Sequence, residues 1–88
     1  MTAARAQGRW LVVAGLRRWA EGSTTDEAAV ELLVGLGGKF THRNCPWVQP
    51  CRRPGWFWLD PDPLRKQAGR LTVQERRVLT LVVALLTE

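Results

Sequence analysis

A segment rich in proline, tryptophan and arginine, residues 39–62, breaks the helical pattern of this chain and most strongly limits the folds open to it. Its aromatic string GWFWL, residues 55–59, is bounded by Pro-Gly and Asp-Pro dipeptides and is therefore predicted to be a strand. Residues 39–41 and 47–49 are the candidate partner strands. Because proline cannot donate a hydrogen bond to a sheet, we expect a short antiparallel sheet or hairpin with irregular turns.

Apolar residues recur at helical spacing before this segment. A first helix is predicted over Arg9–Glu21, although Gly15 weakens it by about 1 kcal/mol relative to alanine. A second helix is predicted to begin at a capping box, Thr24 with Glu27, and to end at Gly37-Gly38. The apolar face of the first helix would consist of Val12, Val13, Leu16, Trp19 and Ala20, and that of the second of Ala28, Ala29, Leu32, Leu33 and Leu36.

Two further helical signals follow the central segment. A short helix is predicted with Asp62 as its cap and Pro63 in its first turn. A longer helix begins at a second capping box, Thr72 with Glu75, and it places its apolar face opposite Arg76, Arg77, Thr80 and Ala84. That face would consist of Val78, Leu79, Val82, Leu85 and Leu86. The order predicts an α+β domain, with three main helices and a short antiparallel, aromatic-rich sheet or hairpin in the middle.

The chain has 88 residues, which is enough for one domain. We expect residues 1–8 to be a flexible N-terminus and residues 9–88 to form a single α+β domain. The formal net charge is +5, and arginine supplies almost all of the basic residues. Two explanations of this charge stay open: attraction to phosphate or to an acidic surface, and a GC-rich genome that encodes ordinary, solvated arginines.

No signal peptide or membrane span is predicted. The apolar stretch Trp10–Leu16 is short and is followed at once by Arg17 and Arg18, without a cleavage pattern. The longest apolar run, Leu81–Leu86, is far shorter than the roughly 20 residues that a membrane helix needs. We therefore expect a cytoplasmic protein.

His42, Cys45 and Cys51 form the one cluster of metal-ligand type in the sequence. Structural zinc sites need four ligands and favour cysteines two to four residues apart, which this spacing does not match. The same residues could instead form a local disulfide or a Cys–His nucleophile, but two reduced, partly buried cysteines are favoured over both. With no other catalytic motif present, the sequence predicts no enzymatic activity, no metal and no cofactor.

The predicted strand is apolar on both faces, since Trp56 and Trp58 would project to one side and Phe57 and Leu59 to the other. One interpretation is that both faces are internal. The other is an exposed aromatic patch beside Arg52-Arg53, suited to base stacking or to a protein hot spot.

Arginine occurs in three adjacent pairs, on the first helix, in the central segment and on the last helix. Each pair could be an ordinary solvated surface, or the pairs could meet in one continuous basic surface. The candidate residues for binding nucleic acid or another partner are Arg17, Arg18, Arg52, Arg53, Trp56, Trp58, Arg76 and Arg77.

Residues 24–40 (TTDEAAVELLVGLGGKF) and 69–86 (GRLTVQERRVLTLVVALL) resemble strings in small uncharacterised proteins from GC-rich bacterial genomes. The resemblance rests on capped amphipathic helices and implies a bacterial protein. It implies no activity, and it transfers no functional residue.

Two functions follow as hypotheses. The first is a small, non-enzymatic binding or regulatory module for nucleic acid, which would bind through phosphate contacts and some stacking. The alternative is a protein–protein interaction module, or a small inhibitor or adaptor, that binds an acidic protein through the aromatic strand or the C-terminal helix. A homodimer through the last helix or the sheet edge is possible in this second class, and no membrane partner is expected.

Overall fold

The structure is a computed structural model that describes residues 2–67 and 71–87, with side chains from residue 11 onward in those ranges. Its elements follow in the order α1 (Thr2–Ala20), α2 (Thr24–Gly35), η1 (Gly38–Phe40), β1 (Val48–Pro50), β2 (Phe57–Leu59), α3 (Pro61–Arg65) and α4 (Val73–Leu86). The predicted α+β class is confirmed, with three main helices and a two-stranded antiparallel hairpin in the middle of the chain.

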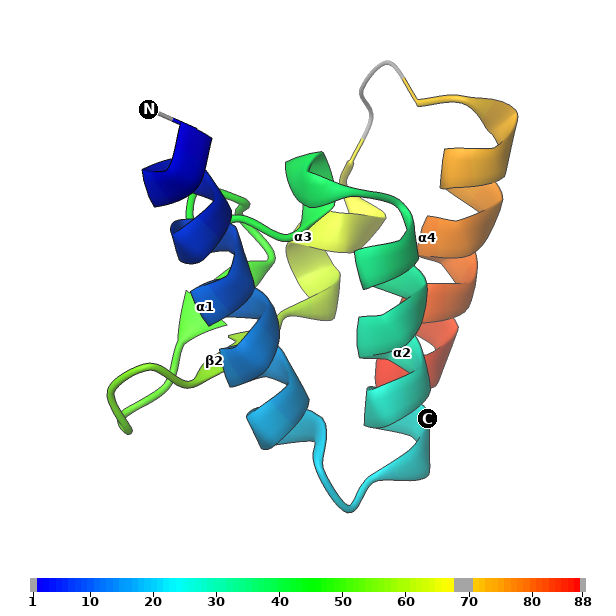
Figure 1. Cartoon of the computed structure of the whole chain (residues 1–88). Coiled ribbons are helices and arrows are strands. Elements are labelled where there is room, and N and C mark those ends of the chain that lie inside the picture. Colours follow the sequence, from blue (N-terminus) through cyan, green and yellow to red (C-terminus); the bar gives the residue numbers. More distant parts are fainter. Residues whose placement is uncertain (1, 68–70, 88) are drawn as a thin grey trace.

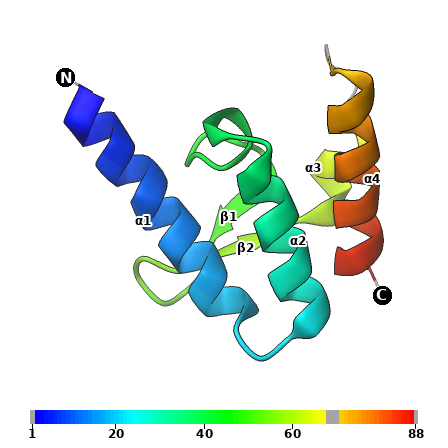
Figure 2. The ribbon, with the colours of Figure 1, turned by 45° about the vertical axis from the view of Figure 1, so that its right-hand side comes forward.

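The three long helices form one layer, in which α2 lies between α1 and α4 (Figure 1). The hairpin and α3 lie behind this layer, the hairpin against α1 and α3 against α4 (Figure 2). The molecule measures 31 × 31 × 18 Å, so it is broad and thin. Because α2 separates the outer helices, residues on the outward faces of α1 and α4 are far apart.

The core lies between the helix layer and the hairpin. Leu16 of α1, Leu33 of α2 and Leu59 of β2 are almost completely buried there. Leu79 and Val82 of α4 close it on the far side of α2. Each of these side chains stabilises the fold by about 1.5–3 kcal/mol relative to leaving it in water. None of the helices within 2–67 and 71–87 has the length and apolar character required to cross a membrane.

Helix α1 buries the face that its apolar spacing predicts. Val12, Val13, Leu16 and Ala20 are buried and Trp19 is half-buried. The helix begins at Thr2, well before the predicted start at Arg9.

Helix α2 begins with a different cap from the predicted one. Ser23, and not Thr24, is the N-cap residue, and its Oγ accepts a hydrogen bond from the Asp26 backbone N–H at 3.4 Å. Gly22, at φ 92°, turns the chain out of α1 and leaves Ser23 extended, which is the conformation a cap requires. The prediction that Thr24 and Glu27 form the capping box was therefore wrong.

The buried face of α2 also differs from the predicted stripe. Ala28 is exposed, whereas Val30 is buried. The reason is that α2 packs against α1 and α4 at once, so its buried face is rotated towards both neighbours. The predicted end of the helix is confirmed by Gly37, whose φ of 106° suits glycine.

Strand β2 is shorter than the predicted 55–59, and β1 begins one residue after the predicted 47–49. The hairpin pairs Val48 with Leu59 and Gln49 with Trp58. The prediction of a strand over residues 39–41 was wrong, because Phe40 belongs to η1 and turns its ring into the core. The Phe40 ring stacks on that of Trp47 at a centroid distance of 6.0 Å. The Phe40 backbone carbonyl accepts a hydrogen bond from Trp47 Nε1 at 2.9 Å, so this carbonyl is not paired with a neighbouring strand.

The last two helices begin at side-chain caps. Asp60 caps α3 and Pro61 is in its first turn. The predicted start at Asp62 and Pro63 was therefore wrong, because it took the second of two consecutive Asp-Pro dipeptides instead of the first. The predicted box at the start of α4 is confirmed: Thr72 Oγ1 accepts from the Glu75 backbone N–H at 3.0 Å, and Glu75 Oε1 accepts from the Thr72 N–H at 2.9 Å.

Candidate nucleic-acid interface

The connection between β1 and β2 is a closed loop. The Cys51 backbone N–H donates to the Trp56 carbonyl at 2.9 Å and closes the base of the loop. The Trp56 N–H donates to the Arg53 carbonyl at 3.1 Å and closes its tip. Between them Pro54 is followed by Gly55 at φ 80°, which is the residue order and backbone geometry of a type II turn. These bonds hold the Arg52-Arg53 pair in a defined position.

The loop is fixed to α1 by a contact between two glycines. A Cβ atom on Gly15 would overlap the carbonyl oxygen of Gly55 and would lie 2.7 Å from the ring of Phe57. Glycine at position 15 therefore lets the hairpin approach the helix backbone, which explains a residue that by itself weakens a helix. This contact joins residues that are forty positions apart in the sequence.

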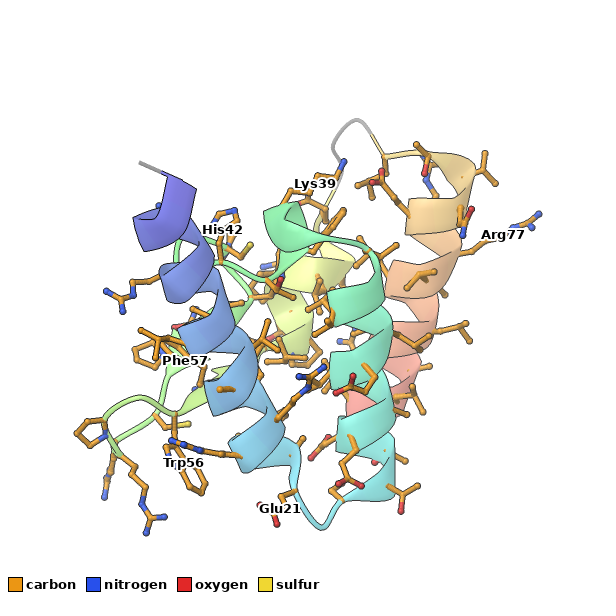
Figure 3. The ribbon with its side chains drawn as sticks, in the orientation of Figure 1. Glu21, Lys39, His42, Trp56, Phe57 and Arg77 are labelled. Atoms are coloured by element: carbon orange, nitrogen blue, oxygen red, sulfur yellow. The ribbon has the colours of Figure 1, made fainter. Side chains whose placement is uncertain are left out.

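The same contact places Arg18 beside the loop. Residues i, i+4 and i+7 lie in one line along a helix, so Leu11, Gly15 and Arg18 form a stripe whose middle residue contacts Gly55. Leu11 and Arg18 are both exposed. Figure 3 shows Trp56 beside the C-terminal half of α1, where Arg18 lies.

Arg17 points to the other flank of α1. Its Nε and Nη2 atoms donate to the two carboxylate oxygens of Glu31 on α2, at 2.8 and 2.9 Å. This hydrogen-bonded pair raises the pKa of Arg17 and lowers the pKa of Glu31. The charge of Arg17 is thus compensated within the fold, and the structure separates Arg17 from Arg18.

Arg53 lies over the ring of Trp56, with its guanidinium carbon 4.7 Å from the ring centroid. This is a cation–π contact, in which the electron-rich face of the ring attracts the cation. Both arginines of the loop are exposed, and Trp56 is half-buried. Neither arginine forms an ion pair with another residue of the described part of the chain.

The two faces of β2 differ in their surroundings. Phe57 and Leu59 are buried on the face towards α1, whereas Trp58 on the opposite face is half-buried, as is its partner Gln49. The outer face of the strand is therefore neither fully internal nor fully open.

The third arginine pair lies on the opposite side of the molecule. Arg76 and Arg77 are exposed on α4, and Arg77 projects away from the helix layer in Figure 3, on the side opposite to Trp56. Arg76 lines a cavity between α3 and α4 together with Arg65. The three pairs therefore do not form one continuous surface: Arg52, Arg53 and Trp56 lie on the loop that is held against α1 one turn before Arg18, whereas Arg76 and Arg77 lie on the other side of the molecule.

His42, Cys45 and Cys51, the predicted cluster of metal-ligand type, make contacts within the backbone turns around them. Cys45 and Cys51 are free thiols. Cys45 is buried and donates to the Lys39 carbonyl at 3.3 Å, and burial raises the pKa of its thiol. The Nδ1 atom of His42 accepts from the Asn44 backbone N–H at 3.2 Å. Across residues 11–67 and 71–87, no group of three His, Cys, Asp or Glu side chains is placed to hold a metal ion.

No protein-family model, curated protein or solved structure matches this chain.

Two residues that position the candidate interface, Gly15 and Gly55, were not predicted as such. A glycine inside an apolar helical pattern is the signal that could have identified Gly15, because it often marks close packing. The sequence contains no local sign that its partner is Gly55.

Proposed function

We propose that this chain is a small, non-enzymatic nucleic-acid-binding module that acts in the cytoplasm and binds through the surface formed by Arg18, Arg52, Arg53 and Trp56. The observation that carries the proposal is the contact of Gly15 with Gly55, which holds the loop with Arg52, Arg53 and Trp56 against α1, one turn before Arg18. A surface of this kind combines phosphate-binding cations with an aromatic side chain.

The charges of this surface support an anionic partner. Arg18, Arg52 and Arg53 make no ion pair with another residue among those described, in contrast to Arg17, which is bound to Glu31. Glu21 is the nearest acidic residue in sequence to Arg18, and it lies in the turn after α1 (Figure 3). Three uncompensated guanidinium groups on one surface favour phosphate over a neutral ligand.

The test is the salt dependence of binding, measured by fluorescence anisotropy with a labelled oligonucleotide and the full chain. Three guanidinium groups that displace counterions from a duplex predict that log K falls with log salt with a slope of about −2.7 on duplex DNA. Each of the variants Arg18→Ala, Arg52→Ala and Arg53→Ala should lower this slope by about 1.

The double variant Arg76→Ala/Arg77→Ala is the matched control, because it removes two exposed arginines from the other side of the molecule. It should keep the binding slope of the wild type. The proposal fails if the wild type shows no salt-dependent binding, or if the control variant loses binding while the loop variants keep it.

A second candidate function is a protein–protein interaction module, with a homodimer as one case. The observation in its favour is that Val73 and Leu81 on the outer face of α4 are 69% and 55% exposed. Sedimentation velocity of the wild type and of Leu81→Glu tests it. A dimer that Leu81→Glu dissociates would support this function, and a monomer at all concentrations would count against the homodimer.

A further inference from the structure

The loop of the candidate interface projects from the body of the molecule. In two views it extends beyond α1, on the side away from α4 (Figure 1, Figure 2). Its residues 52–55 are all exposed. The loop is nevertheless well defined, because backbone hydrogen bonds close it at its base and its tip and Gly15 holds it against α1. A preorganised projection of this kind loses little conformational freedom on binding.

The two arginines of the loop are not equivalent. Arg53 is held over the Trp56 ring by the cation–π contact. Arg52 makes no hydrogen bond, ion pair or cation–π contact with another side chain in the described residues, and its side chain is free to extend from the loop. Arg52 is therefore the side chain that can enter a groove, whereas Arg53 is fixed beside it.

Trp56 does not offer an open platform for base stacking. One face of its ring carries the guanidinium of Arg53, and the residue is half-buried next to α1. Proteins that bind single strands need aromatic faces on which successive bases can stack. The geometry therefore favours a duplex over a single strand.

A single arginine side chain that extends from the loop suits the narrower groove of DNA. The minor groove is about 6 Å wide, which admits an extended side chain but neither a helix nor a two-stranded ribbon. It is narrowest and most negative in A·T tracts, which attract inserted arginines.

We propose that Arg52 inserts into the minor groove of A·T-rich duplex DNA, while Arg53 and Arg18 contact the flanking phosphates. This inference rests on the proposed function and adds to it the class of nucleic acid and the role of each arginine.

The experiment compares four labelled oligonucleotides of equal length by anisotropy with the full chain: an A·T-tract duplex, a G·C duplex, an inosine·C duplex and a single strand. Inosine lacks the N2 amino group of guanine, so its duplex presents a minor groove like that of A·T but a major groove like that of G·C. We expect the A·T and inosine·C duplexes to bind about tenfold more tightly than the G·C duplex. Arg52→Ala should reduce this ratio to about 1, whereas Arg53→Ala should weaken binding to all duplexes by a similar factor.

Each other outcome overturns a defined part of the account. Salt-dependent binding without A·T preference, a preference that Arg52→Ala leaves intact, or tighter binding of the single strand overturns this inference and leaves the proposed function standing. If inosine·C binds like G·C, readout through the minor groove is excluded. Absence of binding to all four oligonucleotides overturns both proposals.

Discussion

On the α4 side of the molecule an arginine pair stands on the outer face of a helix, whereas on the hairpin side an identical pair stands on a closed loop beside a tryptophan and a third arginine. The first pair is placed by its neighbours in sequence, since Thr72 and Glu75 fix where α4 begins. The second pair is placed by a contact between Gly15 and Gly55. The same dipeptide thus acquires its surroundings locally in one region and through tertiary packing in the other.

Because of this difference, we expect substitutions to have different effects in the two regions. Changes on the hairpin side should alter stability or binding at a distance from the changed residue. Changes on the α4 side should be limited to the helix, its cap and the Lys39–Glu75 ion pair. Four predictions test this contrast, in order of decreasing effect.

The largest difference is expected within the hairpin region, between the buried Trp47 and the half-buried Trp56. Trp47 is 4% exposed, stacks on Phe40 and donates a hydrogen bond to the Phe40 carbonyl, so Trp47→Ala should cost about 3–5 kcal/mol of folding free energy. Trp56→Ala should cost about 1 kcal/mol and weaken nucleic-acid binding. Urea unfolding followed by far-UV circular dichroism measures both. Equal losses would show that Trp56 belongs to the core.

Gly15→Ala tests the contact that fixes the loop to α1. The added methyl group would overlap the Gly55 carbonyl, so this variant should be destabilised by about 1–3 kcal/mol although alanine is the better helix former. Gly35→Ala in α2 is the matched control, because nothing lies within 4 Å of a Cβ at that position. The control should be neutral or more stable by up to about 1 kcal/mol. A stable Gly15→Ala protein with wild-type binding would refute the role of this contact.

The α4 region should respond to pH through Glu75. Hydrogen bonds from Lys39, whose Nζ lies 2.8 Å from Glu75 Oε2, and from the Thr72 backbone hold the pKa of Glu75 below its ordinary value. Because the folded state favours the ionised carboxylate, this stabilisation is present above the unfolded pKa of about 4.3 and is lost as pH falls through the lowered folded value.

Unfolding midpoints measured between neutral and acid pH check this expectation. Glu75→Gln should lower the midpoint at neutral pH and should lose part of the acid dependence of the wild type. Glu27→Gln is the control, since the Glu27 side chain caps nothing among the described residues. If Glu27→Gln changed the acid dependence and Glu75→Gln did not, the conclusion that Glu75 rather than Glu27 caps its helix would be wrong.

The smallest effect concerns the two thiols. Cys45 is buried, and burial raises the pKa of its thiol, so it should react more slowly with an aromatic disulfide reagent than the half-buried Cys51. Single Cys→Ser variants assign the two phases of the reaction. Faster reaction of Cys45 would mean that the turn around His42 opens readily in the native state.

Local signals predicted much of this fold and little of its candidate site. The apolar period of α1, the Thr72–Glu75 box and the aromatic strand all depend on residues within a few positions of one another, and they were found. Where two local signals competed, as with Ser23 and Thr24 or the repeated Asp-Pro dipeptide, the prediction took the wrong one. The grouping of Arg18 with Arg52 and Arg53 could not be predicted, because it depends on how closely the hairpin approaches α1 at Gly15.

The most direct test of the account is an NMR titration of the ¹⁵N-labelled chain with an A·T-tract duplex. The backbone amides of residues 51–53, 55 and 56, the amide of Arg18 and the indole N–H of Trp56 report on the hairpin side, and the amides of Arg76 and Arg77 report on the α4 side. The account predicts that the largest chemical-shift changes cluster on the hairpin side while α4 stays unperturbed. Changes that cluster around Arg76 and Arg77, with the loop unaffected, would contradict it.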